Sequence, residues 1–209
     1  MPQSPYSGKS VDEWPAITEN LIKNHPLPEK DIVDAVLTAW DMIFKSAIGG
    51  LLIGKDLYPE PQIMSFLLHA LIPHTLTSKR PDVFKIGNSK TQKDIHYIPN
   101  DAFSIEVKAS SNPSGIYGNR SYAQQNTEKT LKNKDGFLLA VNFAKFEDGN
   151  EIMPVIGKIR FGFVEHTDWK GQTAETGQQA SLSSNAKNFK LKTLYSIPPK
   201  KRNIKTQTT

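Results

Sequence analysis

Cysteine is absent from this chain of 209 residues. Its absence excludes a disulfide scaffold, a cysteine zinc site, an iron–sulfur cluster and an enzyme that uses a thiol nucleophile. The fold must therefore rest on an ordinary hydrophobic core. A chain of this length suits one domain with an appended arm, and it is long enough to bury such a core.

Long apolar runs are also missing. No run reaches the roughly 18 residues that a helix needs to span a bilayer. The N-terminal stretch Met1–Trp14 is polar and carries acids, unlike a secretory signal. We therefore expect a cytoplasmic protein with no membrane partner.

Acidic residues are missing from the C-terminal end of the chain, where none follows Glu175. Bases continue there at Lys187, Lys190, Lys192, Lys200, Lys201, Arg202 and Lys205. Such a segment can neutralise the phosphates of a nucleic acid and release their counterions. A solvated tail has the same composition, so charge alone leaves both interpretations open.

The spacing of apolar residues predicts helices in the first third of the chain. Residues 1–28 are polar and rich in proline, which indicates a loose arm with one helical turn. Helical periodicity then predicts a helix that begins at Glu29 and stops before Gly49. A second helix opens near Pro61, and we expect Pro73 to end or kink it.

Beyond the second helix the period of the pattern becomes two, which is typical of strands. The expected elements are strands at 94–98 and 103–108, a polar helix at 121–134, and strands at 137–143 and 155–164. Turn residues Pro99–Asp101 separate the first two strands and predict a hairpin. The whole order indicates a mixed α/β fold.

The hairpin brings charged residues together. If Pro99–Asp101 form a three-residue loop, Asp94 faces Glu106, and Lys108 shares their side of the hairpin. Opposed carboxylates repel unless they bind a divalent cation, and Mg²⁺ prefers oxygen ligands. A neighbouring lysine could position a water or stabilise charge on a phosphate, as metal-assisted phosphodiester hydrolysis requires. An ordinary exposed strand with a Glu106–Lys108 salt bridge explains the spacing equally well.

The sequence Asp94, followed by Glu106-Val107-Lys108, resembles the PD-(D/E)xK nuclease motif. Asp82 matches the letters of the motif better because it follows Pro81. However, Gly87 and a polar stretch separate Asp82 from the second strand, so we prefer Asp94.

Three longer segments look like the ScaI-like type II restriction endonucleases. These segments are GNRSYAQ at 118–124, GFLLAVNF at 136–143 and IRFGFVEHTDWKGQTAETGQQASL at 159–182. The resemblance runs from about Trp40 to Leu182. It implies a restriction-endonuclease-like core, a mixed central β-sheet flanked by helices, within a nuclease domain at residues 29–185. An N-terminal arm (1–28) and a basic, partly disordered C-terminal segment (186–209) would flank this domain.

The resemblance also implies an activity and its partners. A protein of this kind is a site-specific, Mg²⁺-dependent endonuclease that cleaves double-stranded DNA as a homodimer. It needs a cognate DNA methyltransferase to protect the DNA of its host. Asp94 and Glu106 would bind Mg²⁺, and Lys108 would act on the attacking water. Glu60 begins the second helix, where an acid often joins the metal site of this superfamily, although acids are also common there because they stabilise the helix dipole.

Two segments carry candidate DNA contacts. Asn119, Arg120 and Ser121 follow a glycine at an expected helix start, which suits a phosphate or simple helix capping. A second set, Gln172, Thr176, Gln178 and Gln179, can read base edges, and glutamine can bind adenine through two hydrogen bonds. An ordinary surface loop has the same composition.

Two other functions remain open from the sequence. One is a repair or recombination nuclease of the same superfamily, which would cut by DNA structure. The other is a non-catalytic DNA-binding protein with a degenerate site.

Overall fold

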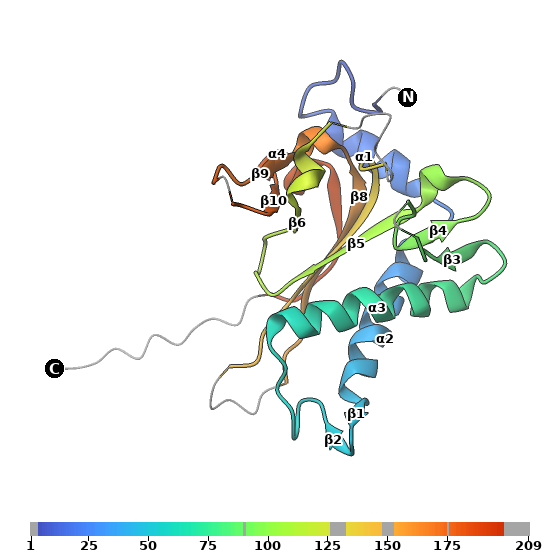
Figure 1. Ribbon diagram of the computed structural model, residues 1–209. Coiled ribbons are helices and arrows are strands. Elements are labelled where there is room, and N and C mark those ends of the chain that lie inside the picture. Colours follow the sequence, from blue (N-terminus) through green and yellow to red (C-terminus); the bar gives the residue numbers. More distant parts are fainter. Residues whose placement is uncertain (1–3, 90, 126–132, 148–152, 175, 199–209) are drawn as a thin grey trace.

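The computed structural model describes residues 4–89, 91–125, 133–147, 153–174 and 176–198. Its centre is a six-stranded sheet in the order β11-β8-β7-β5-β4-β3 (Figure 1). The strands are β3 (Phe84–Ile86), β4 (Ile95–Tyr97), β5 (Ile105–Ser110), β7 (Gly136–Phe143), β8 (Ile156–Val164) and β11 (Leu191–Ser196). Strands β5 and β7 are parallel, whereas the other neighbours are antiparallel. The mixed central sheet that the sequence predicts is therefore confirmed.

Two long helices, α2 (Glu29–Phe44) and α3 (Pro61–Lys79), pack against one face of this sheet. Helix α2 begins where the sequence predicts, with Glu29 and Asp31 in its first turn, where the positive end of the helix dipole favours acids. Pro73 does not end α3, which continues to Lys79 although a proline has no N–H for the carbonyl one turn earlier. None of the helices in the described residues is long and apolar enough to cross a membrane.

A short hairpin links the two helices. Its strands are β1 (Ala47–Ile48) and β2 (Leu51–Leu52), and Gly49 and Gly50 form the turn between them. Both glycines have positive φ, at 59° and 90°. A two-residue turn that twists with its strands requires this backbone conformation, which glycine adopts without strain.

A second layer covers the opposite face of the central sheet. It contains a three-stranded sheet, called the small sheet below, in the order β6 (Tyr117–Asn119), β10 (Gln179–Leu182) and β9 (Trp169–Gly171). Helix α4 (Ser184–Phe189) contributes to the same layer. Its apolar cluster comprises Ile116, Leu138, Ala140, Val164, Trp169, Ala180, Leu182, Ala186 and Leu191. Strand β7 is consequently buried on both faces, which explains its unbroken apolar sequence.

The N-terminal segment is not a loose arm, so that expectation is wrong. Helix α1 (Trp14–Lys23) has 10 residues and packs against β8 and β11. The Thr18 hydroxyl donates to the carbonyl of Phe189, and the ring of Tyr6 is buried. The segment is ordered because it packs against β8 and β11 at one edge of the central sheet. The domain boundaries at residues 28 and 185 stay predictions.

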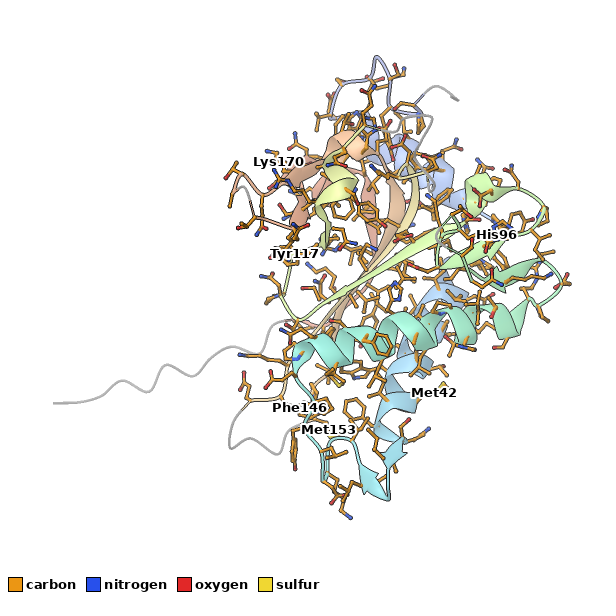
Figure 2. The ribbon with its side chains drawn as sticks, viewed as in Figure 1. Met42, His96, Tyr117, Phe146, Met153 and Lys170 are labelled. Carbon is orange, nitrogen blue, oxygen red and sulfur yellow. The ribbon has the colours of Figure 1, made fainter. Side chains whose placement is uncertain are left out.

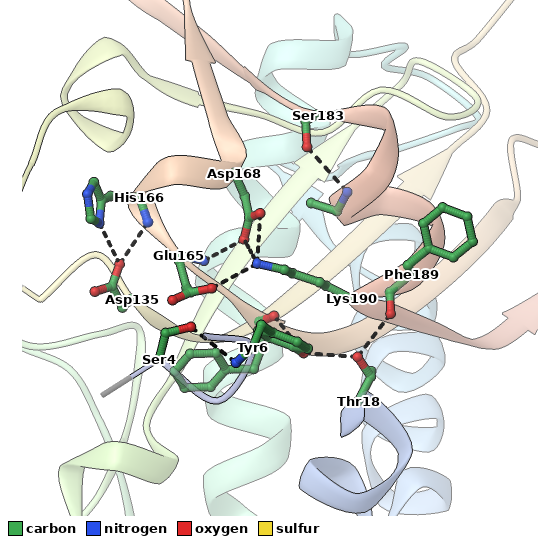
Figure 3. Close-up of polar contacts among 12 residues, drawn as sticks. Ser4, Tyr6, Thr18, Asp135, Glu165, His166, Asp168, Ser183, Phe189 and Lys190 are labelled. Carbon is green, nitrogen blue, oxygen red and sulfur yellow. Dashed lines mark hydrogen bonds and ion pairs between the residues drawn. The ribbon is translucent and has the colours of Figure 1, made fainter. Parts of the chain in front are cut away.

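Much of the C-terminal basic segment also belongs to the fold. The ammonium of Lys190 is buried 2.8 Å from Glu165 Oε2 and 2.9 Å from Asp168 Oδ2 (Figure 3). Lys192 lies 2.7 Å from a carboxylate oxygen of both Glu19 and Glu29. These lysines hold elements together, so they do not form a solvated tail. Lys187 lies in helix α4. The other four bases, Lys200, Lys201, Arg202 and Lys205, lie outside the described residues, so the partial disorder predicted for this segment stays a prediction.

The prediction of a polar helix at 121–134 is wrong at the start of that range. The structure has a short 3₁₀ helix η2 (Arg120–Ala123), after which the backbone of Gln124 is extended. Residues 126–132 lie outside the described part of the chain. Tertiary contacts of Tyr122, described below, override the helical tendency of the local sequence.

Candidate active site

The register of the hairpin agrees with the prediction. Ile95 of β4 pairs with Ile105 of β5, which places Asp94 across from Glu106. The turn itself differs from a simple three-residue loop, because a 3₁₀ helix η1 (Asp101–Phe103) follows Asn100. The Ser104 hydroxyl then accepts a hydrogen bond of 2.9 Å from the Tyr97 N–H in place of a backbone carbonyl.

The two faces of β5 have different surroundings. Ile105 and Val107 are fully buried in the core shared with α2 and α3. Glu106 and Lys108 point to the other face, where their partners on β7 are Leu138 and Ala140 of the second cluster. The charged residues therefore lie on the side of the central sheet that carries the small sheet.

Asp94 is held from two directions. Its Oδ2 accepts a 2.7 Å hydrogen bond from the N–H of Val107 and lies 3.2 Å from Nε2 of His69 on α3. Burial opposes ionisation of Asp94, but His69, Lys108 and the Val107 N–H outweigh it and hold the pKa of this carboxyl below its usual value. The side chain is therefore an oriented carboxylate.

Glu106 is buried and receives two donors on the same oxygen. Lys108 Nζ lies 2.6 Å from Glu106 Oε1, and the Tyr122 hydroxyl donates to that oxygen as well. The Lys108 ammonium also lies 4.8 Å from the centre of the Tyr122 ring. Burial and the charge of Glu106 raise the pKa of Tyr122, so the phenol stays protonated and acts as a donor.

The arrangement fits a cation that binds few protein oxygens. No cluster of three His, Asp or Glu side chains that could hold a metal occurs in the described ranges. Mg²⁺ does not need one, because it usually keeps several waters and takes one or two carboxylates together with substrate phosphate. Asp94 and Glu106 supply hard oxygen donors of that kind.

The other acids weighed from the sequence lie further away. Asp82 is exposed before β3, at the edge of the sheet and two strands from β5, which supports the choice of Asp94. Glu60 is exposed at the N-terminal end of α3 and makes no capping hydrogen bond with its side chain. It precedes His69 by nine residues, roughly 13 Å along the helix axis. Its place in a metal site stays a prediction.

Four of the predicted DNA contacts gather at one open pocket of the small sheet. The pocket has a volume of about 440 Å³ and is lined by Tyr117, Gly118, Asn119, Gln172, Gln178 and Gln179. Figure 2 labels Tyr117 and Lys170 on this sheet, with His96 on β4 at the other side of the molecule. Amide side chains from two separate segments therefore meet on one surface.

The remaining predicted contacts have different surroundings. The Arg120 guanidinium donates to the carbonyls of Ala174 and Gly177 at 3.2 and 3.1 Å, so it braces the loop between β9 and β10. Asn119 is exposed and its side chain does not cap η2, so that alternative is not realised. Ser121 and Thr176 are exposed nearby.

Sequence reasoning missed Tyr122 and His69 as members of this site. Tyr122 falls at the start of the polar helix predicted at 121–134, and nothing in that pattern indicated that its hydroxyl reaches β5. His69 lies in the apolar sequence of the second predicted helix, where a histidine is more often a core or surface residue than a functional one. Its contact with Asp94 depends on how α3 packs beside the hairpin.

Paired carboxylates beside a lysine are a set of groups that suits phosphodiester hydrolysis, and amides line a pocket on the small sheet. The comparisons with known proteins agree with that chemistry. The sequence model of the family described as ScaI restriction endonuclease matches residues 4–195, so the chain belongs to this family.

A curated relative supports membership of the same family. The type II restriction enzyme ScaI of Streptomyces caespitosus is 42% identical over 193 residues, which cover 92% of this chain and 85% of that protein. No solved structure matches the chain significantly. The resemblance drawn from the three sequence segments is therefore confirmed, and the chain is a homologue of a site-specific DNA-cutting enzyme.

Proposed function

We propose that the protein is a type II restriction endonuclease that hydrolyses both strands of a short palindromic DNA site with Mg²⁺. Membership of the ScaI family supports restriction activity. The observation that carries the catalytic assignment is the β4–β5 register, which opposes Asp94 and Glu106 and leaves Lys108 beside them. An ordinary exposed strand would not bury Glu106 at 6% exposure.

The side chains divide the chemistry between them. Asp94 and Glu106 would hold Mg²⁺, which supplies charge neutralisation at the phosphate. Lys108 orients the attacking water and stabilises negative charge as the water oxygen bonds to phosphorus. The bond from phosphorus to the 3′ oxygen breaks, the water loses a proton and the 3′ oxygen gains one. The products are a 5′-phosphate and a 3′-hydroxyl.

The small sheet is proposed to read the DNA. Gln172, Gln178, Gln179 and Asn119 present amides that can pair with base edges, and adenine offers glutamine both a donor and an acceptor. Ser121 would contact a phosphate, and Thr176 would help the glutamines to read base edges. A direct phosphate contact of Arg120 stays a prediction, since the contacts described for its guanidinium are with the reading loop.

The active protein is proposed to be a homodimer in the cytoplasm. A palindrome has two-fold symmetry, and one active site for each strand requires two copies related by the same symmetry. Sedimentation with and without a cognate duplex tests this proposal; a monomer that cuts both strands together would contradict it. A cognate DNA methyltransferase would protect the host DNA.

Incubation of the protein with plasmid DNA and Mg²⁺ tests the function as a whole. Discrete fragments whose sequenced ends share one motif are the expected result. A smear, or cutting confined to junctions, would instead indicate a structure-specific repair or recombination nuclease. A gel shift without cutting would indicate a DNA-binding protein with a degenerate site.

A further inference from the structure

Helix η2 connects the small sheet to the proposed catalytic carboxylate. At its first residue, the backbone N–H of Arg120 donates to the carbonyl of Gln178 at 2.7 Å, and the side chain donates to the carbonyls of Ala174 and Gly177. Two residues later, the Tyr122 hydroxyl donates to Glu106. One short element therefore touches the reading loop at one end and the active site at the other.

The position of Tyr122 is tightly determined by its neighbours. Its ring centre lies 5.1 Å from that of Trp169, the first residue of β9. Behind it, a methyl group added to Gly118 would lie 3.2 Å from the Tyr122 ring and 3.3 Å from Trp169. Because the Tyr122 ring packs closely against Gly118 and Trp169, a displacement of η2 or β9 would move its hydroxyl relative to Glu106.

We infer that Tyr122 is a positioning residue, which makes the orientation of the Glu106 carboxylate depend on the conformation of the DNA-reading loop. The inference rests on the proposed function of Glu106 and of the small sheet. Bases that fit the loop between β9 and β10 would fix Arg120 and η2, and the Tyr122 hydroxyl would then hold Glu106 in its productive orientation. On a site that does not fit, this hydrogen bond would be misplaced and cleavage would be slow.

The test compares Tyr122→Phe with the wild-type protein on two duplexes, the cognate site and a site altered by one base pair. Single-turnover cleavage in Mg²⁺ and the dissociation constant in Ca²⁺ are measured for each. Loss of the hydroxyl should slow cleavage of the cognate site by roughly tenfold or more, since a misplaced group of this kind costs at least about 1.4 kcal/mol. Cleavage of the altered site should change much less, because on that site the hydrogen bond from the Tyr122 hydroxyl to Glu106 is already misplaced.

The binding readout separates positioning from DNA contact. We expect the dissociation constant of Tyr122→Phe for the cognate duplex to stay within about threefold of wild type, since the residue contacts Glu106 and Trp169. Tyr58→Phe is the matched control, because it also removes one hydroxyl, which donates to the Lys55 carbonyl at 2.8 Å in an exposed loop. That variant should cleave both duplexes like wild type.

A second variant tests the link itself. Arg120→Lys keeps the charge but cannot brace the reading loop in the same geometry. If Arg120 and Tyr122 act through one element, the double variant should lose less cognate rate than the product of the two single losses. A loss equal to that product would overturn the inference.

Other outcomes are equally decisive. An unchanged rate in Tyr122→Phe, or a fall by the same factor on both duplexes, would overturn the dependence on reading. A dissociation constant that rises as much as the rate falls would make Tyr122 a binding residue instead. Glu106→Gln is measured alongside: if it cleaves like wild type, the proposed active site has failed, whereas an inactive Glu106→Gln with an unaffected Tyr122→Phe overturns only this inference.

Discussion

His69 Nε2 lies 3.2 Å from Asp94 Oδ2, so helix α3 reaches the carboxylate that is proposed to bind metal. The N–H of Val107 donates to the same oxygen. Asp94 is thus fixed by α3 and by β5 together. Its orientation is therefore a property of the folded chain.

The three motif residues should be indispensable for cleavage. Because Asp94 and Glu106 are partly or fully buried, we choose Asp94→Asn, Glu106→Gln and Lys108→Met, which nearly preserve side-chain volume. Each should lower the single-turnover rate by at least ~10², because a charge at the reacting phosphate is removed or misplaced. Circular dichroism melts would establish that the variants fold.

Asp82→Asn is the control for the choice of aspartate, since Asp82 is exposed before β3, two strands from β5. It should cleave like wild type. Activity in Asp94→Asn with none in Asp82→Asn would move the metal site to Pro81-Asp82. Full activity in Lys108→Met would contradict the proposed role of Lys108 in orienting the attacking water.

The glutamines of the small sheet should determine sequence specificity. Gln178→Ala and Gln179→Ala should weaken binding of the cognate duplex by roughly 1–3 kcal/mol each, the usual cost of removing a pair of hydrogen bonds to one base. Binding to unrelated DNA should change little, because phosphate contacts dominate it. Fluorescence anisotropy in Ca²⁺ with both duplexes measures the difference. Gln92→Ala, in the loop between β3 and β4, should bind both duplexes like wild type.

Salt dependence should separate structural lysines from those that contact DNA. Lys192 is paired with Glu19 and Glu29, so Lys192→Gln should leave the slope of affinity against salt concentration unchanged. Deletion of residues 199–209, which removes Lys200, Lys201, Arg202 and Lys205, should flatten that slope by about 0.9 for each phosphate that these bases neutralise in the full-length protein. An unaltered slope after the deletion would show that these bases are a solvated tail.

Acid should destabilise the fold through His25. Burial lowers the pKa of this imidazole from 6.5 to about 4, and neutral His25 donates to the Phe103 carbonyl while accepting from the Leu27 N–H. Between about pH 6.5 and 4 the unfolded chain binds a proton that the folded chain does not, so the free energy of unfolding falls as pH falls. The full loss is on the order of 3 kcal/mol.

Urea unfolding at pH 7.5 and 4.5 measures this effect, and His25→Gln should make the difference between the two values smaller. Asp94 does not interfere in that window. Its lowered folded pKa contributes stability that is present above about pH 4 and is lost only as pH falls below that value. A variant that keeps the wild-type difference would assign the acid sensitivity to other groups.

The sequence predicted the hairpin well because the information is local. Turn residues at Pro99–Asp101 and alternation on either side determine which residues of β4 and β5 face each other, and the Ile95–Ile105 pair has the predicted register. Strand β7 was equally clear, since its apolar residues occupy both faces. Patterns of this kind can be recognised without knowing which elements pack against the strands.

The errors arose where distant contacts decide the structure. The sequence of residues 1–28 gave no indication that α1 would cover β8 and β11, because its apolar residues are few and interrupted by prolines. Lys190 was read as part of a basic tail, although its partners Glu165 and Asp168 precede it by more than 20 residues. The role of Tyr122 depends on Glu106, 16 residues earlier, and on Trp169.

The buried ammonium of Lys190 has a consequence for how the protein is made. Its ring neighbours Tyr6 and Trp14 come from the first elements of the chain, and its carboxylate partners Glu165 and Asp168 from much later in the sequence. A nascent chain that has not yet extended beyond β10 would have to bury those two acids without a cation, which is strongly unfavourable. This corner of the molecule can therefore close only after Lys190 has been synthesised and can neutralise Glu165 and Asp168.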